Sequence, residues 1–177
     1  MTPREYAFNQ LWAFSLDRYG RDGVSDACLK LQDRLHADVN IVLLCLWMAQ
    51  DGRQLAPDTL REIVDGAAGA WHRDVVVPIR TARKAMKGRT AGDDGANVEA
   101  TRDRVKAVEI ACEKLEQQLL AEAVDEQRAA SPDQPAPLAE RRALARNNLT
   151  AYVGLIAPDA HQSSGALIET LASSCIT

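Results

Sequence analysis

The chain has 177 residues, of which 46% are hydrophobic and 26% are charged, and it carries a formal net charge of −4 at pH 7. This length allows one domain, or one domain with an appendage, and a core large enough to fold without a disulfide or a metal. The first 87 residues carry 12 Lys and Arg against 11 Asp and Glu, whereas the remaining residues carry 9 against 14. Because neither part is strongly basic, the composition argues against a nucleic-acid partner.

The first predicted helices lead to one unusually apolar segment. Apolar spacing predicts helices over residues 3 to 18 and 23 to 36. The segment DVNIVLLCLWMAQDG, residues 38 to 52, then contains nine apolar residues in a row. A membrane-spanning helix needs about 20, so we expect a buried core helix with Asp38 as its N-cap, and no membrane insertion. No secretory apolar region follows the N-terminus, and a cytoplasmic location is therefore expected.

A fourth helical element is predicted from about Ala56 to Gly88, with a break inside it. Pro78 removes a backbone amide and disfavours helical geometry in the residue before it. We therefore expect two helices, or one kinked helix, that meet near residues 73 to 78. The Gly- and Asp-rich segment GRTAGDDGAN, residues 88 to 97, is a predicted linker.

A fifth helix is predicted over residues 98 to 129, and its apolar residues repeat every seven positions. This seam, typical of a helical hairpin or a short coiled coil, consists of Val98, Val105, Cys112 and Leu119, with Val108 and Leu115 in the alternate position. A Pro-rich turn separates it from a helix predicted over residues 138 to 156, and the short connection favours antiparallel packing of the two. Residues 158 to 177 are expected to form a tail with a possible short helix.

Together these elements predict an all-α protein. We expect a compact N-terminal helical bundle, residues 1 to 88, and a long antiparallel helical hairpin, residues 97 to 157, packed on the bundle. The composition agrees with this fold class, because aromatic residues are sparse and strong helix formers are plentiful.

Sequence motifs for a metal, a cofactor or a catalytic nucleophile are absent. His36, His72 and His161 are scattered, and no HxxxH or HExxH pattern pairs them, so each is expected at the surface or at a helix end. The chain has no Gly-rich phosphate motif and no GxSxG motif. Its four cysteines form no CxxC pair, which is typical of reduced cytosolic thiols. We predict no metal, no cofactor and no catalytic residue.

A row of basic residues follows the break in the fourth element. The spacing of this row places its members mainly on one side of a helix: Arg80, Arg83, Lys84 and Lys87. Arg73 precedes the row, on the other side of the predicted break. Guanidinium groups bind carboxylates and phosphates through paired hydrogen bonds, so the row could hold an anionic ligand, an acidic partner helix or RNA. It could equally be a solvated face, or pair with acids of the second half, and this second interpretation is the favoured one.

Several polar residues lie among the apolar ones around the start of the third helix. Buried polar groups need partners, and an arginine of the fourth element would suit a carboxylate. The sequence therefore predicts a cluster that is either a binding pocket or, as we favour, a structural network that fixes helix register. Its candidate members are Asp33, Asp38, Asn40, Arg73 and Arg80.

Two blocks of the sequence resemble an uncharacterised family of small proteobacterial proteins, a domain of unknown function. The first block is residues 11 to 55, in which Trp-x-Phe-Ser-Leu, Cys-Leu-x-Leu-Gln-Asp, Asp-Val-Asn and Cys-Leu-Trp follow in order. The second is WHRDVVVPIRTARKAMKG, residues 71 to 88. This chain departs from the family at His36-Ala37, where the family usually has Gly. The resemblance implies a bacterial, cytoplasmic, helical protein, and it implies no catalytic role.

Three functions remain open on the sequence alone. The leading expectation is a non-enzymatic cytoplasmic interaction or regulatory protein with an unknown protein partner, which requires an exposed apolar stripe. The alternative is an enzyme or a small-molecule binder with a pocket between the N-terminal helices, which requires the polar residues to converge. The third is an RNA- or ribosome-associated protein that uses the basic row.

Overall fold

The computed structural model describes residues 3–89, 95–125, 136–160 and 163–177, and every regular element within these ranges is a helix. The all-α fold class is therefore confirmed. None of the helices in these ranges combines the length and the apolar character needed to cross a membrane. In chain order the elements are α1 (Pro3–Tyr19), α2 (Val24–Leu35), α3 (Val39–Gln50), α4 (Pro57–Asp65), α5 (Ala67–Trp71), the π-helical η1 (His72–Val76), α6 (Val77–Met86), α7 (Gly95–Ala123), α9 (Leu138–Ile156), the 3₁₀-helical η2 (Pro158–Ala160) and α10 (Gly165–Cys175).

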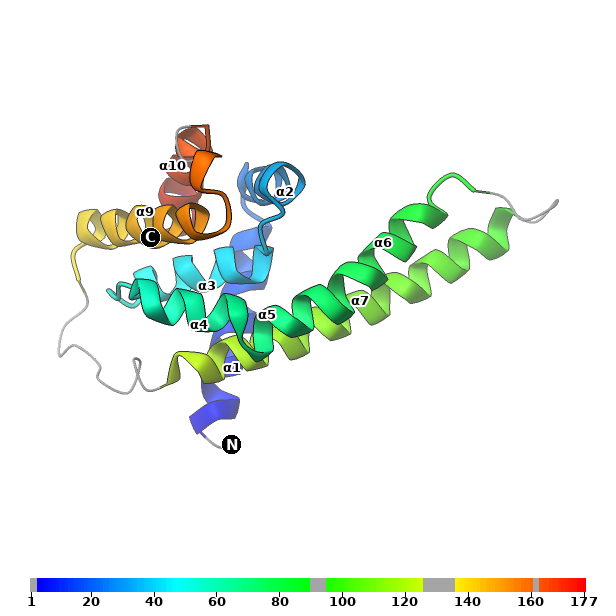
Figure 1. The fold of residues 1–177 in the computed structure, drawn as a ribbon, viewed down its shortest axis with the longest axis horizontal. Helices are drawn as coiled ribbons and strands as arrows, with labels where there is room; N and C mark the ends of the chain where they lie inside the picture. The colour runs from blue at the N-terminus through cyan, green and yellow to red at the C-terminus, as the bar shows by residue number, and fades with distance from the viewer. Residues whose placement is uncertain (1–2, 90–94, 126–135, 161–162) are drawn as a thin grey trace.

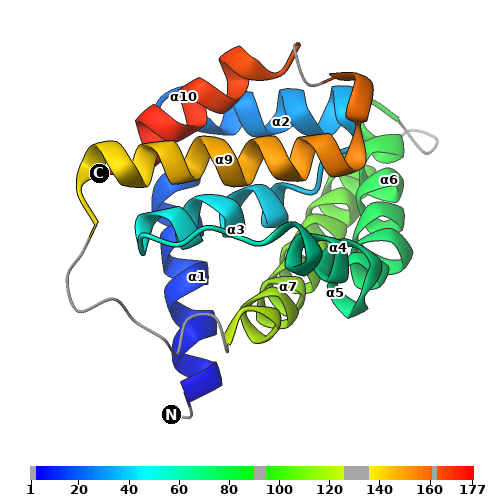
Figure 2. The same ribbon diagram turned by 60° about the vertical axis from the view of Figure 1, so that its left-hand side comes forward.

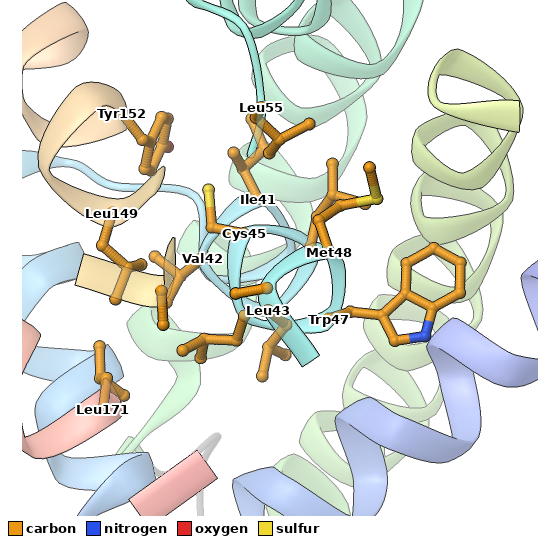
Figure 3. Packing of buried hydrophobic residues seen from close by; sticks show 14 of the residues in the cluster. Ile41, Val42, Leu43, Cys45, Trp47, Met48, Leu55, Leu149, Tyr152 and Leu171 are labelled. Carbon is orange, nitrogen blue, oxygen red and sulfur yellow. The ribbon is translucent and has the colours of Figure 1, made fainter. Parts of the chain in front are cut away.

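Helix α3 is the centre of the hydrophobic core, as the apolar run predicts. The Asp38 carboxylate accepts a hydrogen bond from the amide of Asn40 at 2.8 Å, which confirms the predicted N-cap. Every residue from Asn40 to Ala49 is buried. Figure 3 shows the side chains of α3 spreading in all directions, with Trp47 on the side opposite Leu149 of α9. Burial of each large apolar side chain contributes about 1.5 to 3 kcal/mol.

Helices α9 and α10 cover one side of α3, and α7 lies on the other (Figure 2). Asn148 of α9 fixes the chain that leaves α3: its amide nitrogen donates to the carbonyls of Cys45 and Arg53, and its oxygen accepts from the amide of Leu55. The predicted C-terminal helix is present and longer than expected. Its residues Ile168, Leu171, Ala172 and Cys175 are buried in the same core.

The predicted break in the fourth element is confirmed, and it takes the form of a π-helical turn. Residues His72–Val76 form η1 between α5 and α6, directly before Pro78. The wider π turn accommodates the amide that the proline cannot supply. Helix α5 also approaches the end of α4 closely, since a Cβ atom on Gly69 would lie 1.9 Å from the carbonyl oxygen of Val64. Only glycine fits there.

The long helix α7 has a different partner from the one that the sequence predicts. Figure 1 shows α7 running antiparallel to α6, side by side, with α1 crossing it. Helix α9 lies instead against α3 and α10, so the predicted pairing of α7 with α9 is wrong. Glutamates on α7 pair with arginines on α6, whereas the apolar residues of α9 pack against α3. The predicted Pro-rich turn lies mostly outside the described residues.

Candidate functional site: a buried acid–histidine centre beside a basic groove

The buried polar cluster begins where α2 ends. His36 closes α2 with a positive φ of 54°, and the chain then turns inward. This turn brings Asp38 into the core with 4% of its surface exposed. The backbone amide of Asp38 donates to the hydroxyl of Tyr152 on α9 at 2.8 Å. The cap of the central helix is thereby held from α9 as well as from α3 itself.

Helix α7 supplies a carboxylate and an amide to the same place. Glu116 and Gln117 are 0% and 1% exposed. The Asn40 amide nitrogen donates to Glu116 Oε2 at 3.1 Å, and Gln117 Nε2 donates to Asn40 Oδ1 at 2.8 Å. Gln117 Nε2 also donates to the Ser15 hydroxyl at 3.0 Å. These bonds join α1, α3 and α7 through one polar network, and they satisfy most of its buried groups.

The π-helical turn delivers the last member, His72. Its Nδ1 atom lies 3.1 Å from Asp38 Oδ2 and 3.3 Å from Glu116 Oε1. The side chain is 11% exposed. We call Asp38, His72 and Glu116 the acid–histidine centre. Single π turns inside helices occur frequently at functional sites, and here the turn places the ring against two carboxylates.

The surroundings of the acid–histidine centre favour neutral side chains. Burial raises the pKa of Asp38 well above its usual range, and the neighbouring Glu116 adds to that shift. Burial also raises the pKa of Glu116. It lowers the pKa of His72, although the charge of Asp38 opposes this effect. Two acids in a buried site cannot both ionise without a large cost unless a cation lies between them; otherwise they retain at least one proton.

A groove of about 500 Å³ lies next to this centre, between α1, α2, α3, α6 and α7. Ser15, Asn40 and Gln117 of the buried network line its floor. Its apolar lining consists of Trp12, Leu16, Tyr19, Leu29, Val39, Leu43 and Ile110. Its charged lining consists of four basic side chains, Arg80, Arg83, Lys84 and Lys106, and two acidic ones, Glu109 and Glu113.

Ion pairs fix the basic side of the groove. Arg80 Nε donates to Glu109 Oε1 at 3.0 Å, and its Nη2 donates to Glu113 Oε1 at 2.7 Å. Arg83 also pairs with Glu109. Burial alone would raise the pKa of Glu109, but the hydrogen bonds from Arg83 and Arg80 outweigh it and lower that pKa. The two arginines are thus held in place by α7.

The structure brings only part of the predicted polar cluster together. Asp38 and Asn40 are buried side by side, and Arg80 lines the groove that Asn40 also lines. Asp33 and Arg73 are exposed, and Arg73 donates to the carbonyl of Val64. The expectation that an arginine partners the buried carboxylate is wrong, because η1 places the nearer His72 against Asp38.

The predicted basic row divides into two parts. Arg80 and Arg83 form the ion pairs with α7 described above, as the interpretation of pairing with the acidic half expects. Lys84 is exposed and lies 3.4 Å from Asp33, and Lys87 is exposed at the end of α6. Of this row, Lys87 alone does not line the groove.

Sequence reasoning missed His72, Glu116 and Gln117. His72 was expected at the surface or at a helix end, whereas it is mostly buried at a junction between helices. A signal for the glutamate was present: Glu109, Glu113 and Glu116 are four and three residues apart, which places them on one face of α7. That face is the one that meets α6 and α3. His161 lies outside the described residues.

The fold and the site define an all-helical protein with a buried polar centre and an adjoining groove. The family model described as "Protein of unknown function (DUF2390)" matches residues 10–120, well over half of the chain. The chain belongs to this family, as the resemblance of its two sequence blocks to a domain of unknown function predicts. No curated protein and no solved structure matches the chain.

Proposed function

We propose that this protein is a binding protein whose groove holds a small amphipathic anion, that is, a ligand with an apolar body and a carboxylate, phosphate or sulfonate head. The observation that carries the proposal is the lining of the groove, which combines apolar side chains with four basic ones and only two acidic ones, Glu109 and Glu113, both of which pair with its arginines. A volume of about 500 Å³ lies within the usual range of small-molecule pockets, about 300 to 1,000 Å³.

The geometry of the basic side supports an anion rather than a neutral ligand. Glu109 and Glu113 hold Arg80 in a fixed position through Nε and Nη2. A guanidinium group has five N–H donors, so Arg80 has donors left for a ligand. Lys84 and Lys106 add two cations at the same groove. Positioned donors reduce the ordering cost of binding, because little side-chain freedom remains to be lost.

Fluorescence titration with two matched probes tests this proposal. The anion 1-anilinonaphthalene-8-sulfonate and its neutral parent 1-anilinonaphthalene share the apolar body and differ in the sulfonate. We expect saturable binding of the anion at one site and at least tenfold weaker binding of the neutral probe, since one charged contact is worth about 1.5 kcal/mol or more. Equal affinity for the two probes would contradict the proposal.

Charge-reversal variants sharpen the same titration. Lys106→Glu places a negative charge in the groove, and we expect it to weaken anion binding about tenfold without affecting the neutral probe. Lys87→Glu is the matched control, because Lys87 is likewise an exposed lysine, at the end of α6, and does not line the groove. Equal loss in both variants would indicate general charge attraction instead of a site.

A protein partner is the second candidate, as the sequence first suggests. Val108 and Leu115 of α7 are 52% and 50% exposed and lie seven residues apart on one face. Two turns of exposed apolar surface with this spacing suit a helical partner. The test is capture of proteins from the native cell by wild-type chain and by a Val108→Lys/Leu115→Lys variant. Identical captured proteins would contradict this candidate.

The cytoplasmic location and the lack of a nucleic-acid partner stay predictions.

A further inference from the structure

Each carboxylate of the acid–histidine centre has one oxygen that accepts a hydrogen bond and one that does not. Asp38 Oδ1 accepts from the Asn40 amide, and Glu116 Oε2 accepts from the Asn40 side chain. The other two oxygens, Asp38 Oδ2 and Glu116 Oε1, are buried and lack a hydrogen-bond donor. Both are the atoms nearest to His72 Nδ1. One residue, Asn40, therefore orients both acids toward the ring.

A histidine alone cannot satisfy this arrangement. Neutral imidazole carries at most one proton on Nδ1, and this proton can serve one carboxylate oxygen but not two. A buried acceptor without a donor is costly, and native structures rarely keep one without a reason. Either a cation or a shared proton must therefore lie among the three side chains.

The spacing of the three ligand atoms fits a metal ion. Metal–nitrogen and metal–oxygen bonds of about 2.1 Å in tetrahedral geometry place neighbouring ligand atoms about 3.4 Å apart, and octahedral geometry places them about 3.0 Å apart. The observed separations from His72 Nδ1 are 3.1 and 3.3 Å. All three ligand atoms lie within 4.8 Å of one another.

We propose that Asp38, His72 and Glu116 bind one divalent transition-metal ion, with water completing its coordination. A ligand set of one imidazole and two carboxylates suits Zn²⁺, Mn²⁺ or Fe²⁺, whereas Ca²⁺ and Mg²⁺ prefer oxygen ligands alone. Asn40 acts as the positioning residue for both acids, in the way that outer hydrogen bonds orient metal ligands elsewhere. This inference does not rest on the proposed ligand of the groove, although Asn40 lines that groove as well.

Binding of Zn²⁺ and Co²⁺ to the full-length, chelator-treated protein tests the proposal. Isothermal titration with Zn²⁺ is expected to give one site per chain. Co²⁺ is expected to give visible absorption bands without the near-ultraviolet thiolate bands that cysteine ligation would add. Wild-type protein that binds no Zn²⁺ at 1 mM would overturn the proposal and would identify the centre as a proton-sharing pair of acids.

Variants locate the site. Glu116→Gln keeps the size of the side chain and His72→Ala removes the nitrogen ligand, and each is expected to weaken Zn²⁺ binding at least 100-fold. The matched controls are Glu113→Gln, one turn away on the same helix, and His36→Asn at the exposed end of α2, where asparagine tolerates the positive φ. Both controls are expected to bind like wild type. Undiminished binding in Glu116→Gln or His72→Ala would overturn the assignment, and circular dichroism verifies that each variant is folded.

Discussion

The core around α3 and the seam between α7 and its neighbours are both buried, yet they are built from opposite chemistry. Around α3, ten consecutive residues are buried and almost all of them are apolar. Along α7, the buried positions include Glu109, Glu116 and Gln117. Apolar burial stabilises a fold wherever shapes fit, whereas buried carboxylates contribute little net stability and are costly when unpaired. On the two proposals made above, α3 holds the protein together and the polar positions of α7 serve binding.

The largest expected effect comes from the apolar core. Leu44 is 0% exposed on α3, so Leu44→Ala removes buried methyl groups and leaves a cavity. We expect the free energy of unfolding to fall by about 3 kcal/mol, measured by urea denaturation. The control is Leu115→Ala on the exposed face of α7, for which a change within about 0.5 kcal/mol is expected. Similar losses at both positions would remove α3 from its central role.

A smaller loss is expected where the seam is polar but uncharged. Gln117→Ala leaves the side-chain oxygen of Asn40 without its donor, and it removes the bonds to Ser15. We expect a loss of about 2 kcal/mol, measured by thermal unfolding. Gln118→Ala is the control, because Gln118 is the next residue on α7 and its side chain is exposed. A loss at Gln118 as large as that at Gln117 would contradict the role given to the buried network.

The ion pairs of the seam are expected to depend on pH. At pH 7, Glu109→Gln removes charged hydrogen bonds from Arg80 and Arg83, and we expect a loss of about 1.5 kcal/mol. The pKa of Glu109 is lowered in the folded state, so its stabilisation is complete above the ordinary glutamate pKa of about 4.3 and disappears as the pH falls through the folded value. Urea denaturation of both proteins between pH 7 and pH 3 measures this. A difference that stays constant or widens at low pH would contradict the assignment.

The smallest effect is expected at the exposed edge of the seam. Lys84 Nζ lies 3.4 Å from Asp33 Oδ1, and both side chains are more than half exposed. Lys84→Ala is therefore expected to change the free energy of unfolding by less than about 0.5 kcal/mol. The same variant is expected to weaken binding of the anilinonaphthalene sulfonate, because Lys84 lines the groove. A loss of more than about 1 kcal/mol in the free energy of unfolding would contradict this prediction. It would mean that even the exposed ion pairs of the seam stabilise the fold.

The apolar pattern predicts the fold class, most helices and the core, but not which helices pair. The run of nine apolar residues predicts α3, and Pro78 predicts the junction that becomes η1. The heptad seam of α7 points to a helical partner without saying which, and the short Pro-rich connection favours α9. The observed partners are α6 and α1, and Arg80 and Arg83 of α6 pair with glutamates of α7. Apolar periodicity leaves this choice open, and the charge complementarity between α6 and α7 is an additional signal that it does not include.

The candidate site is only half predictable for a related reason. Asp38 and Asn40 stand out as polar residues beside an apolar run, so their burial can be expected. The partner of Asp38, His72, lies 34 residues further along the chain, and the partner of Asn40, Glu116, lies 76 residues further. No local spacing connects these pairs. His72 lies in the π turn at the junction of the helices, and although Pro78 predicts a break there, it does not predict the π geometry or the direction of the ring.

The central claim is that Asp38 and Glu116 are retained for binding and not for stability, and a variant with both acids replaced tests it most directly. Asp38→Asn/Glu116→Gln keeps the shapes and the N-cap, since asparagine caps helices as well as aspartate does. In thermal unfolding without metal, the variant is expected to be as stable as wild type or more so. Zn²⁺ at 100 times its dissociation constant is expected to stabilise wild type by about 2.7 kcal/mol and the variant by none. A metal-free variant destabilised by more than about 2 kcal/mol, together with wild type that Zn²⁺ does not stabilise, would contradict the claim.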